Sequence, residues 1–173
     1  MNAEQAKVVT EYFANMFDNE SKTTAKVLAA VPESGRSFKP DAKSRTAWEL
    51  ATHVALGDIW FLDSIINGKF DGDPEAEKQA AAKFKSVTDL VDFYNREFPA
   101  RVKQLRALPA DKLTRTIDFF GMMQLPAAGY LGIANNHSVH HRGQLAAYLR
   151  AAGGKVPSIY GGSADEPMTH AAG

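Results

Sequence analysis

The chain has 173 residues, the size of one ordinary domain, and its 20 basic and 20 acidic residues cancel. This balance gives no general attraction to nucleic acid or to an anionic membrane, and the absence of cysteine excludes disulfides, thiolate ligands and a cysteine nucleophile. Without an apolar run near the roughly 18 residues of a membrane span, and with no signal-type start, we expect a cytoplasmic protein that binds neither nucleic acid nor membrane.

The first third of the sequence predicts two amphipathic helices. Apolar residues recur at helical spacing over residues 6–31, and Pro32 ends that pattern. After a long polar connection, Thr46 and Glu49 have the spacing of a capping box, which marks a helix start. The second helix, over residues 47–67, is apolar around most of its circumference, so we expect it to be the most buried.

The rest of the chain predicts two more helices. Residues 67–75 are rich in turn formers, and a helical pattern then follows over residues 87–108, with a kink or weakening expected at Pro99. Residues 109–126 alternate loosely, which suits a short hairpin or an extended crossover. The last helix is predicted over residues 126–153, ending at a pair of glycines.

Four amphipathic helices with no extended sheet predict an all-α protein, a four-helix bundle in which sites are built from facing helices. The two long connections argue against a simple bundle with short loops. We expect one domain over residues 1–162 and a mobile tail over residues 163–173, which are rich in small and polar residues.

Three of the chain's five histidines lie within the stretch NNHSVHHRGQ of the last helix. His137 and His141 stand about 40° apart on the helix and about 6 Å apart along its axis, so they share a face. His140 flanks this pair. The spacing resembles HExxH metal sites, but Ser138 replaces the glutamate, so that protease chemistry does not transfer. Alone, the pair also fits two ordinary histidines on a helix.

A third histidine, His53, lies within the second predicted helix, at the edge of its apolar stripe. This position fits a metal ligand and fits equally a hydrogen-bonded histidine at a helix interface. Three imidazoles from two facing helices would leave coordination positions open, as expected of a catalytic ion.

The stretches ELATHVALGDIWFL and NNHSVHHRGQLAAYLRAAGGKVPSIYG resemble the DinB-like (YfiT-like) superfamily, whose members include metal-dependent enzymes. The resemblance extends from the first helix to about Gly162. It implies a four-helix bundle with up-down-down-up order and one divalent ion bound by His53, His137 and His141. It also implies zinc or nickel, sometimes iron, as the metal, and a homodimer as the assembly.

The resemblance is less specific about activity. Family members include thiol transferases that use low-molecular-weight thiols such as bacillithiol or mycothiol, which implies a metal-dependent transferase acting on a small-molecule substrate. Two alternatives stay open: a metal-dependent hydrolase of a small substrate, and a metal-binding stress-response protein without enzymatic activity. A helical dimer with unused histidines is the simplest alternative.

Five further residues bear on the site. Glu20 falls at the centre of the first helix's apolar stripe, where a carboxylate needs a partner. It is a candidate general base or acceptor for an imidazole N–H, or else it reaches the bundle end or pairs with a lysine. Tyr130, Gln144 and Tyr148 share the histidine face and are candidates for lining a substrate pocket, although ordinary packing explains them as well. Arg142 points to the other side, where we expect a structural ion pair or an interface.

Overall fold

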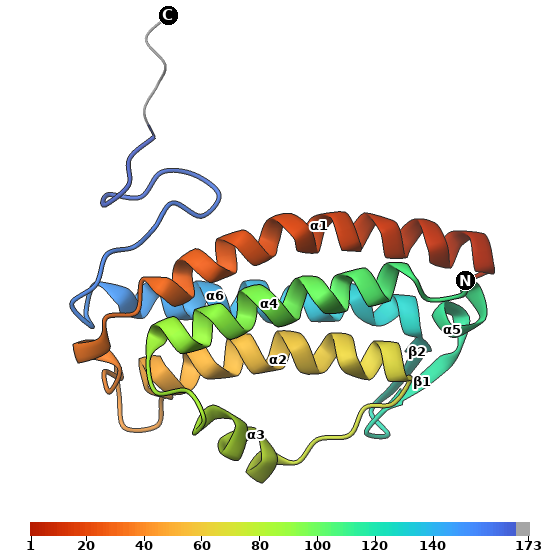
Figure 1. Ribbon diagram of the computed structural model, residues 1–173, viewed down its shortest axis with the longest axis horizontal. Coiled ribbons are helices and arrows are strands. Elements are labelled where there is room, and N and C mark those ends of the chain that lie inside the picture. The colour runs from red at the N-terminus through yellow and green to blue at the C-terminus, as the bar shows by residue number, and fades with distance from the viewer. Residues whose placement is uncertain (169–173) are drawn as a thin grey trace, which may run out of the picture.

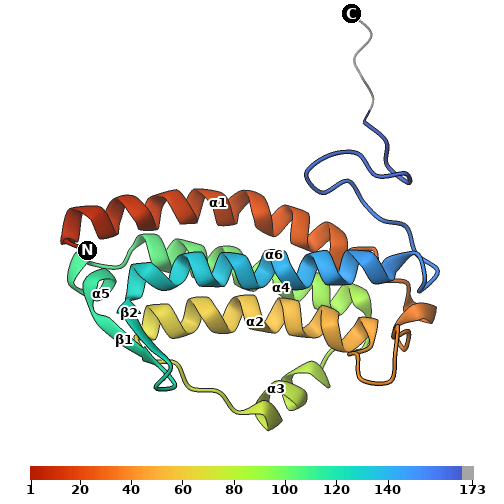
Figure 2. The ribbon, with the colours of Figure 1, turned by 180° about the vertical axis from the view of Figure 1, so that it is seen from behind.

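The computed structural model describes residues 1–168, and four long helices lie side by side in it (Figure 1). They are α1 (Ala3–Ala29), α2 (Ala47–Asn67), α4 (Val87–Arg106) and α6 (Tyr130–Leu149). Helices α1 and α2 each pack against both α4 and α6, so α1 and α2 occupy opposite corners (Figure 2). Followed along the chain, the helices run up, down, down and up. The predicted all-α four-helix bundle is confirmed.

Two of the helices begin where the sequence places capping boxes. Thr46 Oγ1 accepts the backbone N–H of Glu49 at 3.1 Å, and the Glu49 carboxylate accepts the backbone N–H of Thr46 at 2.7 Å. Ser86 and Asp89 make the same exchange at the start of α4. At the other end of α2, Gly68 has a φ of 78°, the left-handed conformation that ends many helices. Local chemistry therefore sets both ends of α2, which has the predicted bounds.

The core lies along the axis between the four helices. Helix α2 buries more residues than any other helix of residues 1–168, as its apolar circumference predicts. Leu50, Val54, Leu62 and Ile65 are each fully buried. Removing this apolar surface from water is the main favourable term that holds the helices together.

The first of two short helices that were not predicted follows α2. Helix α3 (Pro74–Ala81) lies in the connection between α2 and α4, and it stands outside the bundle (Figure 1). Asp73 caps it by accepting the backbone N–H of Glu75 at 2.9 Å, and Pro74 occupies its first turn, where proline fits. None of its residues is buried. A short exposed helix leaves no apolar period, so hydropathy does not reveal it.

Residues 109–126 contain α5 (Ala110–Thr114) and an antiparallel hairpin of β1 (Thr116–Phe119) and β2 (Met123–Pro126). The predicted short hairpin is confirmed, whereas α5 was not predicted. In the turn of the hairpin, Phe120 and Gly121 both have a positive φ, 53° and 72°. The hairpin covers the end of the bundle at which α6 begins.

Helix α4 runs through Pro99 without interruption, so the predicted weakening does not end it. After α6, Arg150 Nε donates to Asp165 at 2.9 Å and Ser158 N donates to Glu166 at 2.8 Å, which ties residues up to 166 to the end of α6. The predicted mobile tail also includes residues 169–173, which lie outside the described residues. No helix among residues 1–168 combines the length and hydropathy needed to cross a bilayer.

Candidate metal centre

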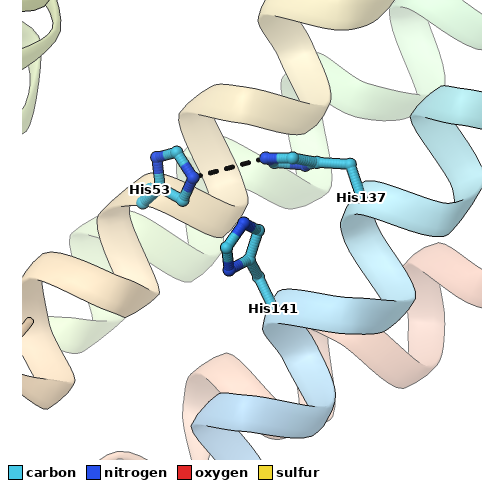
Figure 3. A group of neighbouring side chains, drawn as sticks. All are labelled: His53, His137 and His141. Carbon is cyan, nitrogen blue, oxygen red and sulfur yellow. Dashed lines mark hydrogen bonds between the residues drawn. The ribbon is translucent and has the colours of Figure 1, made fainter. Parts of the chain in front are cut away.

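Three histidines from two helices converge at one point (Figure 3). His53 lies on α2, and His137 and His141 lie one turn apart on the facing helix α6. Each offers one ring nitrogen, and these three atoms lie within 4.8 Å of one another. The Nε2 atoms of His53 and His137 are 3.3 Å apart, close to the roughly 3.3 Å that separates two ligands of a tetrahedral zinc ion. The donor set therefore fits one transition-metal ion.

The outer nitrogens of two of these rings have acceptors. His53 Nδ1 lies 2.9 Å from Glu77 Oε1 of α3, and His141 Nδ1 lies 3.2 Å from Gln144 Oε1. An imidazole that donates its Nδ1–H outward keeps a lone pair on Nε2, which is the form that binds a metal. The unpredicted helix α3 thus supplies the partner that orients His53.

His137 differs because its outer nitrogen faces a buried carboxylate. The Asp58 side chain is 2 % exposed, and its Oδ2 accepts hydrogen bonds from Tyr94 at 2.8 Å and Ser138 at 2.9 Å. Its Oδ1 lies 4.0 Å from His137 Nδ1. Neither of these two atoms has a hydrogen-bond partner among residues 1–168. Sequence reasoning missed Asp58, although it follows His53 by five positions on the same helix.

Gly57 provides the room that the His137 ring needs. A Cβ atom at position 57 would lie 2.7 Å from His137 Cε1, closer than side chains tolerate. The Phe61 ring lies one turn further along α2, with its centroid 5.0 Å from that of His137. The glycine lies four residues after His53, so both lie on the same face of α2.

Burial favours the neutral form of two of the imidazoles, those of His53 and His141. It lowers the pKa of His141 from 6.5 to about 4, against the hydrogen bond that His141 donates to Gln144, which raises the pKa. Burial also lowers the pKa of His53, and the hydrogen bond to Glu77 opposes that shift. Since a metal ion competes with protons for the same nitrogen, neutral histidines are ready to bind at neutral pH.

Glu20 takes part in a different cluster, on the other side of α6. Its Oε2 lies 2.6 Å from an Arg142 nitrogen and accepts the Tyr160 hydroxyl at 2.7 Å. Arg142 is 1 % exposed and also donates to Thr24 Oγ1 at 3.1 Å. The structural ion pair predicted for Arg142 is therefore present. The partner of Glu20 is thus an arginine and not the lysine that was considered. The role of Glu20 as a general base stays a prediction.

The remaining candidates separate into core and site. Tyr130 is fully buried and donates to the Ile117 carbonyl at 2.9 Å, and Tyr148 is 7 % exposed and packs on Phe38. Packing explains both tyrosines, and of the three pocket candidates Gln144 adjoins the histidines through His141. His140 is exposed beside His141, as its flanking position predicts.

The protein is therefore a four-helix bundle with a candidate metal centre made of histidines alone. Two facing helices bring the three imidazoles together. Residues 2–170 match the model of the DinB family, and the chain belongs to that family. The resemblance stated from the sequence is confirmed.

Two proteins of Bacillus subtilis are similar to this chain over most of their length. The chain is 27% identical to the uncharacterized protein YrdA of Bacillus subtilis (strain 168), over 90% of each chain. It is also 27% identical to the uncharacterized protein YjoA of that strain, over 79% of this chain and 86% of YjoA.

Two crystal structures have a similar fold. A DinB-like protein from Bacillus cereus ATCC 10987 aligns with a TM-score of 0.70 and 28% identity, over 87% of this chain and 97% of that chain. The DinB-like protein YjoA of Bacillus subtilis aligns with a TM-score of 0.65 and 24% identity, over 83% and 93% of the two chains. At that identity YjoA supports the fold alone.

Proposed function

We propose that His53, His137 and His141 bind one divalent transition-metal ion, with zinc or nickel preferred and iron as the next candidate. The observation that carries the proposal is the convergence of three imidazole nitrogens within 4.8 Å. Imidazole suits zinc, nickel and iron, whereas magnesium and calcium prefer oxygen ligands.

We propose further that the chain is a metal-dependent transferase using a low-molecular-weight thiol of the bacillithiol or mycothiol type. The histidine group contains three ligands and no carboxylate, which corresponds to catalytic sites that keep a position open for water or substrate. A divalent ion held there would supply a Lewis acid that favours the deprotonated form of a thiol or of water. Because the chain has no cysteine, the thiol has to come from a second substrate.

The surrounding side chains favour an anionic substrate. Burial lowers the pKa of His53 and of His141, and the charge of the exposed Arg45 also contributes to the lowered pKa of His53. A cation beside the site attracts the carboxylates that small cellular thiols carry. Glu77 and Gln144 keep the His53 and His141 rings oriented from the outside.

Metal analysis of protein purified without an affinity tag tests the metal centre. We expect about one zinc, nickel or iron per chain, and loss of at least about 100-fold in affinity in His137→Ala, since each ligand supplies a share of a binding free energy near 10–16 kcal/mol. His140→Ala is the matched control, because His140 flanks the group without belonging to it, and we expect unchanged affinity. A wild type that carries no metal and gains none on incubation with these ions would contradict the proposal.

Product analysis of the metal-loaded protein, with and without an added thiol, tests the reaction class. Transfer to the thiol supports the transferase. Turnover of a small substrate without thiol would indicate the hydrolase instead, and loaded protein inactive in both assays would favour a metal-binding stress-response protein. Light scattering on the same preparations tests the predicted homodimer.

A further inference from the structure

We propose that Asp58 is a positioning residue for the metal centre: Tyr94 and Ser138 hold its carboxylate, and the carboxylate receives the outer N–H of His137 when Nε2 of that ring binds the ion. The inference rests on the proposed metal binding and extends it to a residue outside the ligand set.

The carboxylate is fixed from three helices. Asp58 belongs to α2, Tyr94 to α4 and Ser138 to α6, and they are 3 %, 1 % and 9 % exposed. Burial, followed by the charge of Asp58, raises the pKa of Tyr94 well above 10, so its hydroxyl stays protonated and donates. Both hydroxyls donate to Oδ2. Oδ1 is therefore left for another donor, and a buried carboxylate oxygen without one is costly.

The hydrogen bonds between the rings explain why His137 Nδ1 stands 4.0 Å from that oxygen. His53 donates Nδ1–H to Glu77, so its Nε2 is an acceptor, and His137 must donate from its own Nε2 across the 3.3 Å contact. The proton is then on Nε2 of His137, and its Nδ1 presents a lone pair to a carboxylate. Two acceptors cannot bond, which accounts for two unpartnered buried atoms side by side.

Metal binding reverses this arrangement. With Nε2 held as a ligand, the N–H of the His137 ring would lie at Nδ1, where it faces Asp58 Oδ1. A carboxylate that accepts the outer N–H of a ligating histidine orients the ring and makes it a better ligand. Ser138 follows His137 directly, so the ligand and the support of its carboxylate lie on the same turn of α6.

Zinc affinity, measured by competition with a chromophoric chelator, tests the inference. We expect Asp58→Asn to bind zinc about 10- to 100-fold more weakly, the usual effect of removing such a partner. Ser138→Ala and Tyr94→Phe each remove one support of the carboxylate, and we expect losses of roughly 3- to 10-fold, below that range. Ser21→Ala is the matched control, because Ser21 lines the same small cavity as Asp58 and Ser138 but donates to the Asp18 carbonyl. Its affinity should be unchanged.

A double variant separates positioning from general damage. If Ser138 acts through Asp58, Asp58→Asn/Ser138→Ala binds zinc as weakly as Asp58→Asn alone, whereas independent structural effects would multiply. In ¹⁵N-histidine spectra of the wild type, we expect a slowly exchanging His137 Nδ1–H signal that appears on zinc addition.

The outcomes are distinct. If the wild type binds zinc and the affinity of Asp58→Asn lies within twofold of it, the inference on Asp58 is overturned and the proposed metal centre is not affected. A wild type that binds no metal overturns both. Should Asp58→Asn not fold, Tyr94→Phe and Ser138→Ala decide, because a zinc affinity equal to that of the wild type in both variants would overturn the inference.

Discussion

Two neighbouring residues of α6, His141 and Arg142, belong to polar clusters of opposite character. The Arg142 cluster faces α1 and is saturated: a buried guanidinium meets Glu20, Thr24 and Tyr160. The His141 cluster faces α2, and its inner nitrogens point at one another, with one hydrogen bond between His137 and His53 among them. Saturated polar groups hold a structure in place, whereas converging groups with free lone pairs can bind a ligand.

Electrostatics separates the two clusters as well. Arg142 keeps its charge in the interior because a carboxylate lies within 2.6 Å. Burial instead lowers the pKa of His141 to about 4, so that imidazole is neutral at neutral pH. One face of α6 thus carries a compensated ion pair, and the other carries an imidazole whose neutral form burial favours.

Breaking the saturated cluster has the largest expected effect. Arg142→Ala leaves the Glu20 carboxylate without its charge partner, and we expect a loss of about 3 kcal/mol in the free energy of unfolding, measured by urea denaturation. Arg150→Ala is the control at the end of the same helix, where the arginine is 54% exposed and pairs with Asp165. It should cost below about 1 kcal/mol. Equal losses in the two variants would refute the contrast.

Crowding the histidine cluster should separate binding from stability. In Gly57→Ala the new methyl group would lie 2.7 Å from His137 Cε1, so the ring has to move. We expect zinc affinity to fall roughly 10-fold, the low end for a displaced partner, without loss of stability, because alanine favours a helix by up to about 1 kcal/mol.

Gly143→Ala is the matched control for this test. A Cβ at position 143 on α6 meets nothing within 4 Å. That variant should gain up to about 1 kcal/mol in stability at unchanged zinc affinity. If both variants bind zinc equally well, the close approach at Gly57 has no role in the site.

The smallest expected effect concerns pH. Because the pKa of His141 is lowered to about 4 in the folded protein and is near 6.5 when unfolded, the unfolded chain binds the extra proton between these values. The stability that comes from neutral His141 is present above pH 6.5 and is lost as pH falls toward 4. His53 acts in the same direction.

Urea denaturation of metal-free protein at a series of pH values measures this effect. Subtracting the curve of His141→Gln removes the contribution of carboxylates that titrate in the same range. We expect the difference between wild type and variant to be constant above pH 6.5 and to change below it. A difference that is constant down to pH 4 would show that burial does not shift this histidine.

Several parts of the fold followed from local sequence. The capping box of Thr46 and Glu49 and the left-handed Gly68 set the bounds of α2. Helix α3 was not predicted, because an exposed helix needs no apolar face. Glu77, the partner of His53, lies on this helix and was therefore missed as well. Tyr130 shares the histidine face on the helical wheel, yet it packs under the hairpin, because the wheel does not say what covers each turn.

The sequence by itself determined the four helices and the spacing that puts His137 and His141 on one face of α6, because helical periodicity is a local property. It left His53 open on the wheel, and its place among the ligands came from family resemblance. Only the tertiary structure placed Nε2 of His53 3.3 Å from Nε2 of His137. It also paired Glu20 with Arg142 and placed the Asp58 carboxylate beside Nδ1 of His137. The first two of these contacts join residues 84 and 122 positions apart, and no periodicity along the chain encodes such separations.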